Sequence, residues 1–233
     1  MKYQRIAIMV AMDKELALIL PLLGKDTIET TDKGDRTARI RIGRYGNLEI
    51  ALMKSGIGKV NAALATQAMI DKFGPDLVIS TGVAGGTGSA GILDVVVAER
   101  LTFHDVWCGP GTEPGAADGC PRFLTPPASL LQLKAIAPEQ GLRHGLICSG
   151  DIFVSTPEEV AAIRAKFPDV QAVEMESGAI AQTCYRHGTD MIAIRVVSDT
   201  PGGEDNIAQY SDFWSQAPER TFGVVKNLLD SLQ

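Results

Sequence analysis

Short segments rich in Ile, Val and Leu recur along the chain and alternate with longer stretches of helical spacing. In Ile6–Val10 every position is apolar, which is typical of a strand buried on both faces of a sheet. This alternation constrains the fold most, since it favours an α/β arrangement with a mainly parallel or mixed sheet. The predicted strands are Ile6–Ala11, Ala38–Ile42, Leu48–Met53, Leu77–Thr81, Val95–Ala98, Gly145–Ser149, Ala172–Glu174 and Met191–Val197.

The helical segments have recognisable ends. Lys59–Phe73 has apolar residues at helical spacing, and the Gly-Pro pair that follows should end the helix. Another helix should begin with Thr156 as its cap, Pro157 in the first turn and Glu159 completing a capping box. No linker or internal repeat interrupts the pattern, so one domain over residues 1–233 is expected. Two more helical regions are predicted: Ser177–Arg186, and Tyr210–Leu232 with a break at Pro218.

Composition narrows the classes of function. The 233 residues are 45% hydrophobic and 21% charged, close to the globular average. A net charge of −6 without a Lys/Arg run argues against nucleic acid as a partner. We expect no membrane association and no signal peptide, because no apolar stretch or cleavage site has the required form. The four cysteines form no CxxC pair, which favours reduced thiols in the cytoplasm and argues against zinc.

Two glycine-rich segments resemble nucleotide-binding motifs but depart from them. Gly86–Gly91 fits GxGxxG, yet a strand-like run follows it instead of the helix that would hold a pyrophosphate. Gly56–Lys59 resembles part of a P-loop, but Val60 stands where Ser or Thr would meet Mg²⁺. The three histidines have no metal-ligand spacing, so neither a dinucleotide nor a metal site is predicted.

In open α/β sheets ligands bind beyond the carboxyl ends of the strands, so the residues after each predicted strand are the candidates for a site. Carboxylates, glycines and one aromatic side chain gather there. Acids that arrive from distant points of the chain suit glycoside chemistry, in which one carboxyl moves a proton and another handles water. These strand-end segments are Met12–Glu15, Ser55–Gly58, Gly82–Gly86, Gly150–Phe153, Glu174–Glu176 and Ser198–Pro201.

Each acid also has an ordinary structural explanation. Glu15 suits the first turn of a helix, and Asp199 could close a turn before Pro201. Glu174 and Glu176 could be ion-pair partners. Their joint placement at strand ends favours a functional site.

Six segments, in order over nearly the whole chain, resemble the 5′-methylthioadenosine/S-adenosylhomocysteine nucleosidases of the nucleoside phosphorylase superfamily. The resemblance implies a single α/β domain with a central mixed, partly barrel-like sheet flanked by helices. It also implies a homodimer that needs no metal or cofactor and hydrolyses the N-glycosidic bond of 5′-thio-substituted adenosines. The segments are Ala11–Glu15, Ser55–Lys59, Thr81–Gly86, Ser149–Phe153, Val173–Glu176 and Ser198–Asp199.

The resemblance further implies roles for individual residues. Asp199, beside Ser198, would protonate adenine at N7, and Glu15 would activate the attacking water. Glu176 would bind the ribose hydroxyls, and Phe153 would stack on adenine. The other expected substrate contacts are Met175 against the sugar, the backbone of Ile152 or Val154 at the base edge, Ile57 at the 5′ substituent, Tyr210 closing over the substrate, and Met12, Val83, Ala84, Gly85 and Glu174.

Two features depart from the family pattern. Val83 stands where many members have Ser, so a polar contact near the water or the sugar is in question. Segment 104–123 also differs, and in the family this region helps to shape the pocket for the 5′ substituent. The wider stretch 104–128, rich in Pro and Gly, is expected to be either an ordered loop over a site or a mobile flap.

Three alternatives stay open at this point. A phosphorylase of the same superfamily would use phosphate, but Glu15 about 4 Å from phosphate costs ~1 kcal/mol in water and ~4 kcal/mol at an effective dielectric near 20. The first loop has no arginine to offset this repulsion, which favours hydrolysis. A non-catalytic nucleoside-binding protein would not need all three acids. A hydrolase of related 6-amino nucleosides, such as aminodeoxyfutalosine, is the third alternative.

Overall fold

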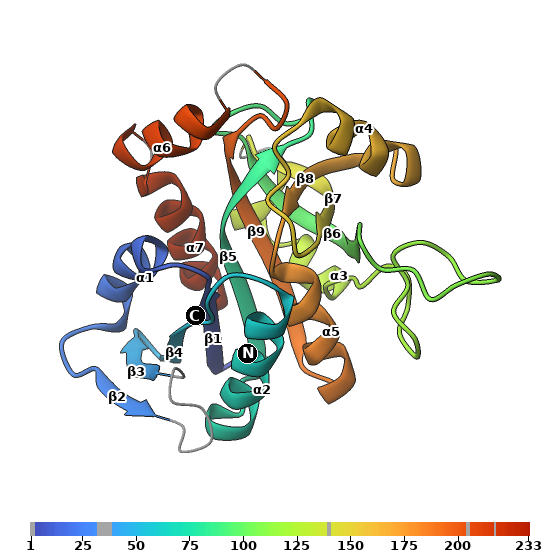
Figure 1. Cartoon of the computed structure of the whole chain (residues 1–233). Helices are drawn as coiled ribbons and strands as arrows, with labels where there is room; N and C mark the ends of the chain where they lie inside the picture. Colours follow the sequence, from blue (N-terminus) through green and yellow to red (C-terminus); the bar gives the residue numbers. More distant parts are fainter. Residues whose placement is uncertain (1–2, 32–38, 139–140, 204–205, 217) are drawn as a thin grey trace.

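The computed structural model describes residues 3–31, 39–138, 141–203, 206–216 and 218–233. In this part of the chain, one mixed sheet of nine strands forms the centre of the molecule, and helices cover both of its faces (Figure 1). The strands are β1 (Arg5–Val10), β2 (Ile28–Thr31), β3 (Arg39–Tyr45), β4 (Leu48–Lys54), β5 (Leu77–Gly86), β6 (Val95–Phe103), β7 (Arg143–Ser149), β8 (Val170–Glu174) and β9 (Asp190–Asp199). The α-helices are α1 (Asp13–Ile19), α2 (Lys59–Phe73), α3 (Ala128–Leu131), α4 (Pro157–Lys166), α5 (Ser177–His187), α6 (Asn206–Gln216) and α7 (Pro218–Leu232).

The sheet closes on itself over part of its width. Its strand order is β2-β3-β4-β1-β5-β8-β7-β6-β9, and β9 also pairs with β5. This second pairing joins β5, β8, β7, β6 and β9 into a ring. Five of the nine strand pairs in the described residues are parallel, and the antiparallel ones are β2–β3, β3–β4, β5–β8 and β6–β9. The prediction of an α/β fold with a mixed, partly barrel-like sheet flanked by helices is therefore confirmed.

The central strands are apolar at every position because each face of the sheet packs against its own layer of helices. In β1, Ala7 and Met9 belong to the core that includes α2 and α5. Ile6, Ile8 and Val10 belong to the opposite core, which includes α1 and α7. All five side chains are at most 2% exposed, as the continuous apolar run predicted.

The predicted helix ends are confirmed. Helix α2 has the predicted bounds and ends at Gly74, which adopts a left-handed conformation with φ +60°. At the start of α4, the Glu159 N–H donates to Thr156 Oγ1 at 3.2 Å, and the Glu159 carboxylate accepts the Thr156 N–H at 3.0 Å. Helix α6 is described to Gln216 and α7 from Pro218, and residue 217, next to the predicted break, lies outside the described residues.

Three of these elements were not predicted: β2, α1 and the four-residue helix α3. All four residues of β2 are exposed, so this edge strand has no burial pattern and is held by antiparallel pairing with β3. Helix α1 is only seven residues long, too short for a clear helical period.

The prediction that Gly82–Gly86 forms a strand-end loop is wrong, because β5 continues through Gly86. These glycines allow close approach and do not make a turn. A Cβ at Gly85 would lie 2.5 Å from Pro201 Cγ, and one at Gly86 would lie 2.4 Å from the Ala90 carbonyl oxygen.

Residues 104–127 follow β6 as an irregular extension that projects from the body of the molecule (Figure 1). The Gly115 N–H donates to the Val106 carbonyl at 2.9 Å, and Thr102 Oγ1 donates to the Arg122 carbonyl at 2.8 Å. The extension thus has the internal bonds of an ordered loop. In the described residues, no helix combines the length and apolarity needed to cross a bilayer.

Candidate active site

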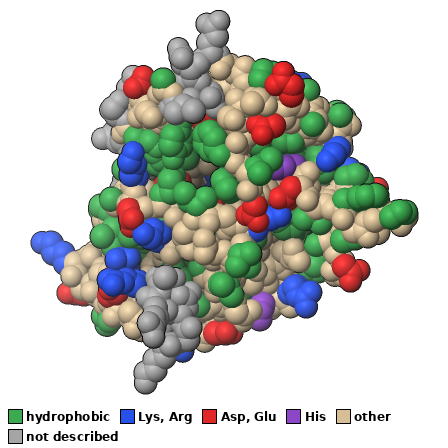
Figure 2. All heavy atoms as spheres, in the orientation of Figure 1, with side chains coloured by type: hydrophobic (Ala, Val, Ile, Leu, Met, Phe, Trp, Pro, Cys, Tyr) green, Lys and Arg blue, Asp and Glu red, His purple; other side chains and the backbone are tan. Residues whose placement is uncertain are grey.

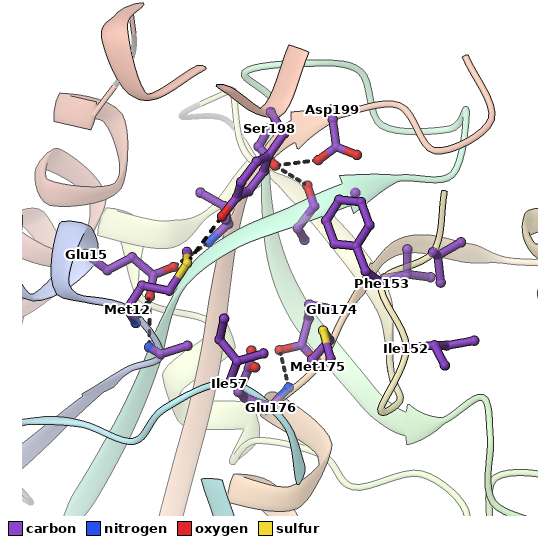
Figure 3. Close-up of a pocket in the computed structure, with 17 residues that line it drawn as sticks. Met12, Glu15, Ile57, Ile152, Phe153, Glu174, Met175, Glu176, Ser198 and Asp199 are labelled. Atoms are coloured by element: carbon purple, nitrogen blue, oxygen red, sulfur yellow. Dashed lines mark hydrogen bonds between the residues drawn. The ribbon is translucent and has the colours of Figure 1, made fainter. Parts of the chain in front are cut away.

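One cavity of about 90 Å³ lies where the ends of several strands meet, with side chains from α1 and α6 beside it (Figure 3). Ala11 and Val173 are two of its 17 lining residues. The structure brings all the sequence-predicted site residues into the rest of that lining: Met12, Glu15, Ile57, Val83, Ala84, Gly85, Ile152, Phe153, Val154, Glu174, Met175, Glu176, Ser198, Asp199 and Tyr210.

The carboxylate of Glu15 accepts three backbone N–H groups. Oε2 accepts those of Ala11 and Met12 at 2.8 and 2.9 Å, and Oε1 accepts that of Val83 at 3.1 Å. The bond to Met12 caps α1, so the place in a first helical turn that the sequence suggested and a place in the cavity belong to the same side chain. Burial raises the pKa of Glu15 above its usual range, because desolvation outweighs the lowering by Arg195 and the three N–H donors.

Glu15 can approach β5 only because position 82 has no side chain. A Cβ on Gly82 would lie 2.4 Å from Glu15 Oε1, closer than any van der Waals contact allows. Glycine at this position therefore determines where a buried carboxylate lies.

Ser198 and Asp199 form the end of β9 on another side of the cavity (Figure 3). Both are buried, with exposures of 1% and 2%. Ser198 Oγ lies 2.7 Å from Asp199 Oδ1 and donates to it. This hydrogen bond orients the Asp199 carboxylate from the adjacent residue.

Glu174 differs from the other acids because it accepts four hydrogen bonds from the protein, one of them from a guanidinium. Oε1 accepts the Ser149 hydroxyl, and Oε2 accepts the backbone N–H groups of Glu176 and Ser177 and the Arg195 guanidinium, at 3.1, 2.8 and 2.9 Å. Four donors match the roughly four lone-pair sites of a carboxylate. Burial alone would raise the pKa of Glu174, but Arg195 and the other donors hold it below its usual range.

Glu176 is the N-cap residue of α5, and its side chain reaches across to the start of α2. Its Oε1 accepts the Gly58 N–H at 2.8 Å. Gly58 has φ +96°, a conformation that glycine adopts without strain. Burial and the neighbouring charge of Glu174 raise the pKa of Glu176 to about 8. The two adjacent carboxyls therefore differ in charge at neutral pH, with Glu174 ionised and Glu176 largely protonated.

Aromatic side chains form the remaining side of the cavity. Phe153 and Tyr210 meet edge to face with ring centroids 5.9 Å apart. The Tyr210 hydroxyl donates to Met12 Sδ at 3.2 Å. Phe153, Ile152 and Ile57 are each about half exposed, so the cavity opens to solvent between them, and Figure 2 shows hydrophobic side chains around a hollow on this face.

Two contributors received no role from the sequence, although Arg195 is the cationic side chain nearest to the predicted strand ends. Arg195 is 3% exposed and bonds to Ser80 Oγ at 2.9 Å as well as to Glu174. An arginine inside the apolar run Met191–Val197 was a usable signal, because a buried charge needs a partner. The Gly58 N–H has no equivalent signal, since its partner is 118 residues away.

The arrangement is suited to acid–base chemistry on a small ligand with one flat apolar face. Buried carboxyls line three sides of the cavity, and an aromatic ring lies on the fourth (Figure 3). Its lining contains no Lys or Arg in the part of the chain that the structure describes. Nor do the described residues hold a group of three His, Cys, Asp or Glu placed to bind a metal ion.

Known proteins resemble this chain over nearly its whole length. The family model of the phosphorylase superfamily matches residues 5–230. A 5′-methylthioadenosine/S-adenosylhomocysteine nucleosidase of Lysinibacillus sphaericus is 38% identical over 98% of this chain and 100% of its own length.

Solved structures agree with this similarity. The S-adenosylhomocysteine nucleosidase of Streptococcus pyogenes in complex with 5-methylthiotubericidin has a TM-score of 0.92 at 32% identity, covering 100% of this chain and 99% of that one. Futalosine hydrolase of Helicobacter pylori has a TM-score of 0.88 at 32% identity, covering 98% of each chain.

The Gly82→Ala substitution should displace Glu15 and lower the free energy of unfolding by about 1–3 kcal/mol, because the new methyl group overlaps the carboxylate. Gly223→Ala is the matched control, since a Cβ at Gly223 in α7 meets no atom within 4 Å. Urea unfolding measures both changes. Equal stability of the two variants would contradict the proposed close contact.

Glu176→Gln should reduce the loss of stability on going from pH 5 to pH 8. The folded-state pKa of about 8 lies above the ordinary 4.5, so the folded protein binds more protons between these values. Its free energy of unfolding therefore falls as pH rises, by at most about 1.4 kcal/mol per pH unit for this group. Urea unfolding at both pH values tests this, with Glu158→Gln on the exposed start of α4 as the control. An unchanged slope in the Glu176 variant would be the contrary result.

Proposed function

This chain belongs to the 5′-methylthioadenosine/S-adenosylhomocysteine nucleosidases of the phosphorylase superfamily, and we propose that it uses water to cleave the N-glycosidic bond of these two adenosine derivatives. The products are adenine and the 5-thio-substituted ribose. The observation that carries the proposal is that Asp199, Glu15 and Glu176 line different sides of one cavity. In the reaction the C1′–N9 bond breaks and a water oxygen bonds to C1′.

Asp199 supplies the proton that the leaving base needs. Adenine is a poor leaving group as an anion, so protonation at N7 is worth about 10²–10⁴-fold in rate. Ser198 holds the carboxyl at the end of β9. Phe153 stacks on the base, and the backbone of Ile152 or Val154 contacts its edge, so that N7 meets Asp199.

Glu15 accepts the proton of the attacking water. Three backbone N–H groups hold its carboxylate in place, so it needs no rearrangement when the water arrives. Its raised pKa makes the carboxylate a stronger base toward the water than an ordinary glutamate. Carboxylate charge beside the sugar also stabilises the developing oxocarbenium ion.

The remaining lining residues bind the substrate. Glu176 takes the ribose hydroxyls, and Met175 packs against the sugar. Glu174 lines the same wall, but its bonded oxygens suit it better to holding Arg195 and the start of α5. The 5′ substituent is assigned to Met12, Ile57 and Tyr210, and the wall beside the sugar to Val83, Ala84 and Gly85.

Water is favoured over phosphate as the nucleophile. Phosphate would have to lie near the Glu15 carboxylate, and no Lys or Arg of the described residues lines the cavity to offset that repulsion.

We also propose a homodimer formed through the groove between α2 and α5. This groove encloses about 590 Å³ and includes Val60 and Leu64, which lie one turn apart on α2. Their side chains are 68% and 59% exposed, and a pair of large apolar groups facing water is typical of an interaction surface. A cytoplasmic location is proposed as well, because all four cysteines are free thiols.

The chain should release adenine from methylthioadenosine and adenosylhomocysteine at a rate that does not depend on added phosphate. Chromatography of the free base, with inosine and futalosine as further substrates, measures this. Asp199→Asn should lower turnover about 10²–10⁴-fold while an adenosine analogue still binds. Strict phosphate dependence with a sugar 1-phosphate product would refute hydrolysis, and full turnover in the variant would remove Asp199 from the reaction.

Leu64→Glu should convert the dimer to a monomer in analytical ultracentrifugation, because it places a charge in the apolar groove. Ile28→Glu is the control, since Ile28 is also 68% exposed but lies on β2 at the other edge of the sheet. A dimer that survives the Leu64 change would place the interface elsewhere.

A further inference from the structure

Three charged side chains link the loops beside the cavity. Lys59 begins α2, Asp105 follows β6, and Asp151 follows β7. The ammonium group of Lys59 lies 2.8 Å from both carboxylate oxygens of Asp105 and 3.9 Å from Asp151 Oδ2.

Backbone N–H groups complete a closed ring of bonds among the same three residues. The Asp151 N–H donates to Asp105 Oδ2 at 2.8 Å. The Lys59 N–H donates to Asp151 Oδ1 at 2.7 Å. Each residue therefore forms a hydrogen bond or ion pair with both of the others, and these contacts hold the three loops together.

The ring also supplies a missing helix cap. Gly58 is the N-cap residue of α2 and has no side chain, so the first N–H groups of the helix need acceptors from elsewhere. Glu176 accepts the N–H of Gly58, and Asp151 accepts that of Lys59. The positive charge of a lysine is unfavourable at this position, because the positive end of the helix dipole repels it. A favourable interaction elsewhere must therefore offset this repulsion. The ion pair with Asp105 is such an interaction.

The ring is directly next in sequence to two parts of the site that the proposed function places against the substrate. Lys59 directly follows Gly58, whose N–H holds Glu176 Oε1. Asp151 directly precedes Ile152 and Phe153, which line the cavity. The ring is partly shielded from water, because the Lys59 and Asp105 side chains are only 21% and 25% exposed. Its bonds are therefore less weakened by solvent than those of fully exposed ion pairs.

We propose that Lys59, Asp105 and Asp151 form a positioning clamp, which holds the Gly58 N–H on Glu176 and the 150–154 loop beside the base. This proposal rests on the proposed function for its effect on catalysis, whereas the clamp itself is a property of the unliganded protein. None of the three residues touches the substrate. The clamp acts through Glu176 and Phe153.

The test is a double-mutant cycle between Lys59→Met and Glu176→Ala. Lys59→Met keeps the length of the side chain but removes its charge, and it should lower kcat/KM about 10- to 100-fold by letting Glu176 shift. In the Glu176→Ala background the same change should cost several-fold less, because the effect through Glu176 is gone and only the effect through the 150–154 loop remains. Lys59→Arg should restore most of the activity.

Lys226→Met is the matched control. Lys226 Nζ forms a 2.7 Å ion pair with Asp230 on α7, away from the cavity, and its loss should leave kcat/KM unchanged. Additive losses in the cycle, failure of Lys59→Arg to restore activity, or an equal loss in the Lys226 variant would overturn the clamp.

Amide hydrogen exchange of the unliganded protein tests the clamp independently of catalysis. Lys59→Met should speed amide exchange in residues 55–62 and 150–155, and Lys226→Met should not. Unchanged exchange in both segments refutes the clamp even if the enzyme is active. If the unaltered chain releases no adenine, the proposed function fails, and faster exchange still supports the clamp.

Discussion

The structure depends on holding four carboxyl groups out of water around one small cavity. Glu15, Glu174, Glu176 and Asp199 are each at most 8% exposed. Burial of a carboxylate is costly unless hydrogen-bond donors replace the lost water. Here backbone N–H groups at strand and helix ends supply most of the donors, and Arg195 supplies the charge.

The acids accept different sets of hydrogen bonds, and the protonation of Glu174, Glu176 and Glu15 differs as a result. Glu174 receives the guanidinium and three further donors, which keeps it ionised. Glu176 receives one N–H and faces the charge of Glu174, so it holds its proton to about pH 8. Glu15 accepts three N–H groups, and burial nevertheless raises its pKa. A site that must both give and take protons needs such differences among similar groups.

The strands explain how these donors come together. Pairing of β5 with both β8 and β9 places Gly82, Glu174 and Ser198 on adjoining strands. Glycine at position 82 leaves room for Glu15, and the loops after β4, β6 and β7 meet at Lys59, Asp105 and Asp151. The acids and the loops around them therefore depend on the closure of one part of the sheet.

The sequence alone determined the local features of this protein. The apolar run at Ile6–Val10, the cap at Thr156 and the segments that line the site are all local patterns, because burial and capping impose a residue type every few positions. Only the tertiary structure decided that Gly82–Gly86 is strand, that Glu174 turns inward to Arg195, and that Gly58 holds Glu176. Those outcomes depend on partners far away in the chain, such as the 118 residues between Gly58 and Glu176. A distant hydrogen-bond partner leaves no period in the sequence, whereas a buried helix or strand does.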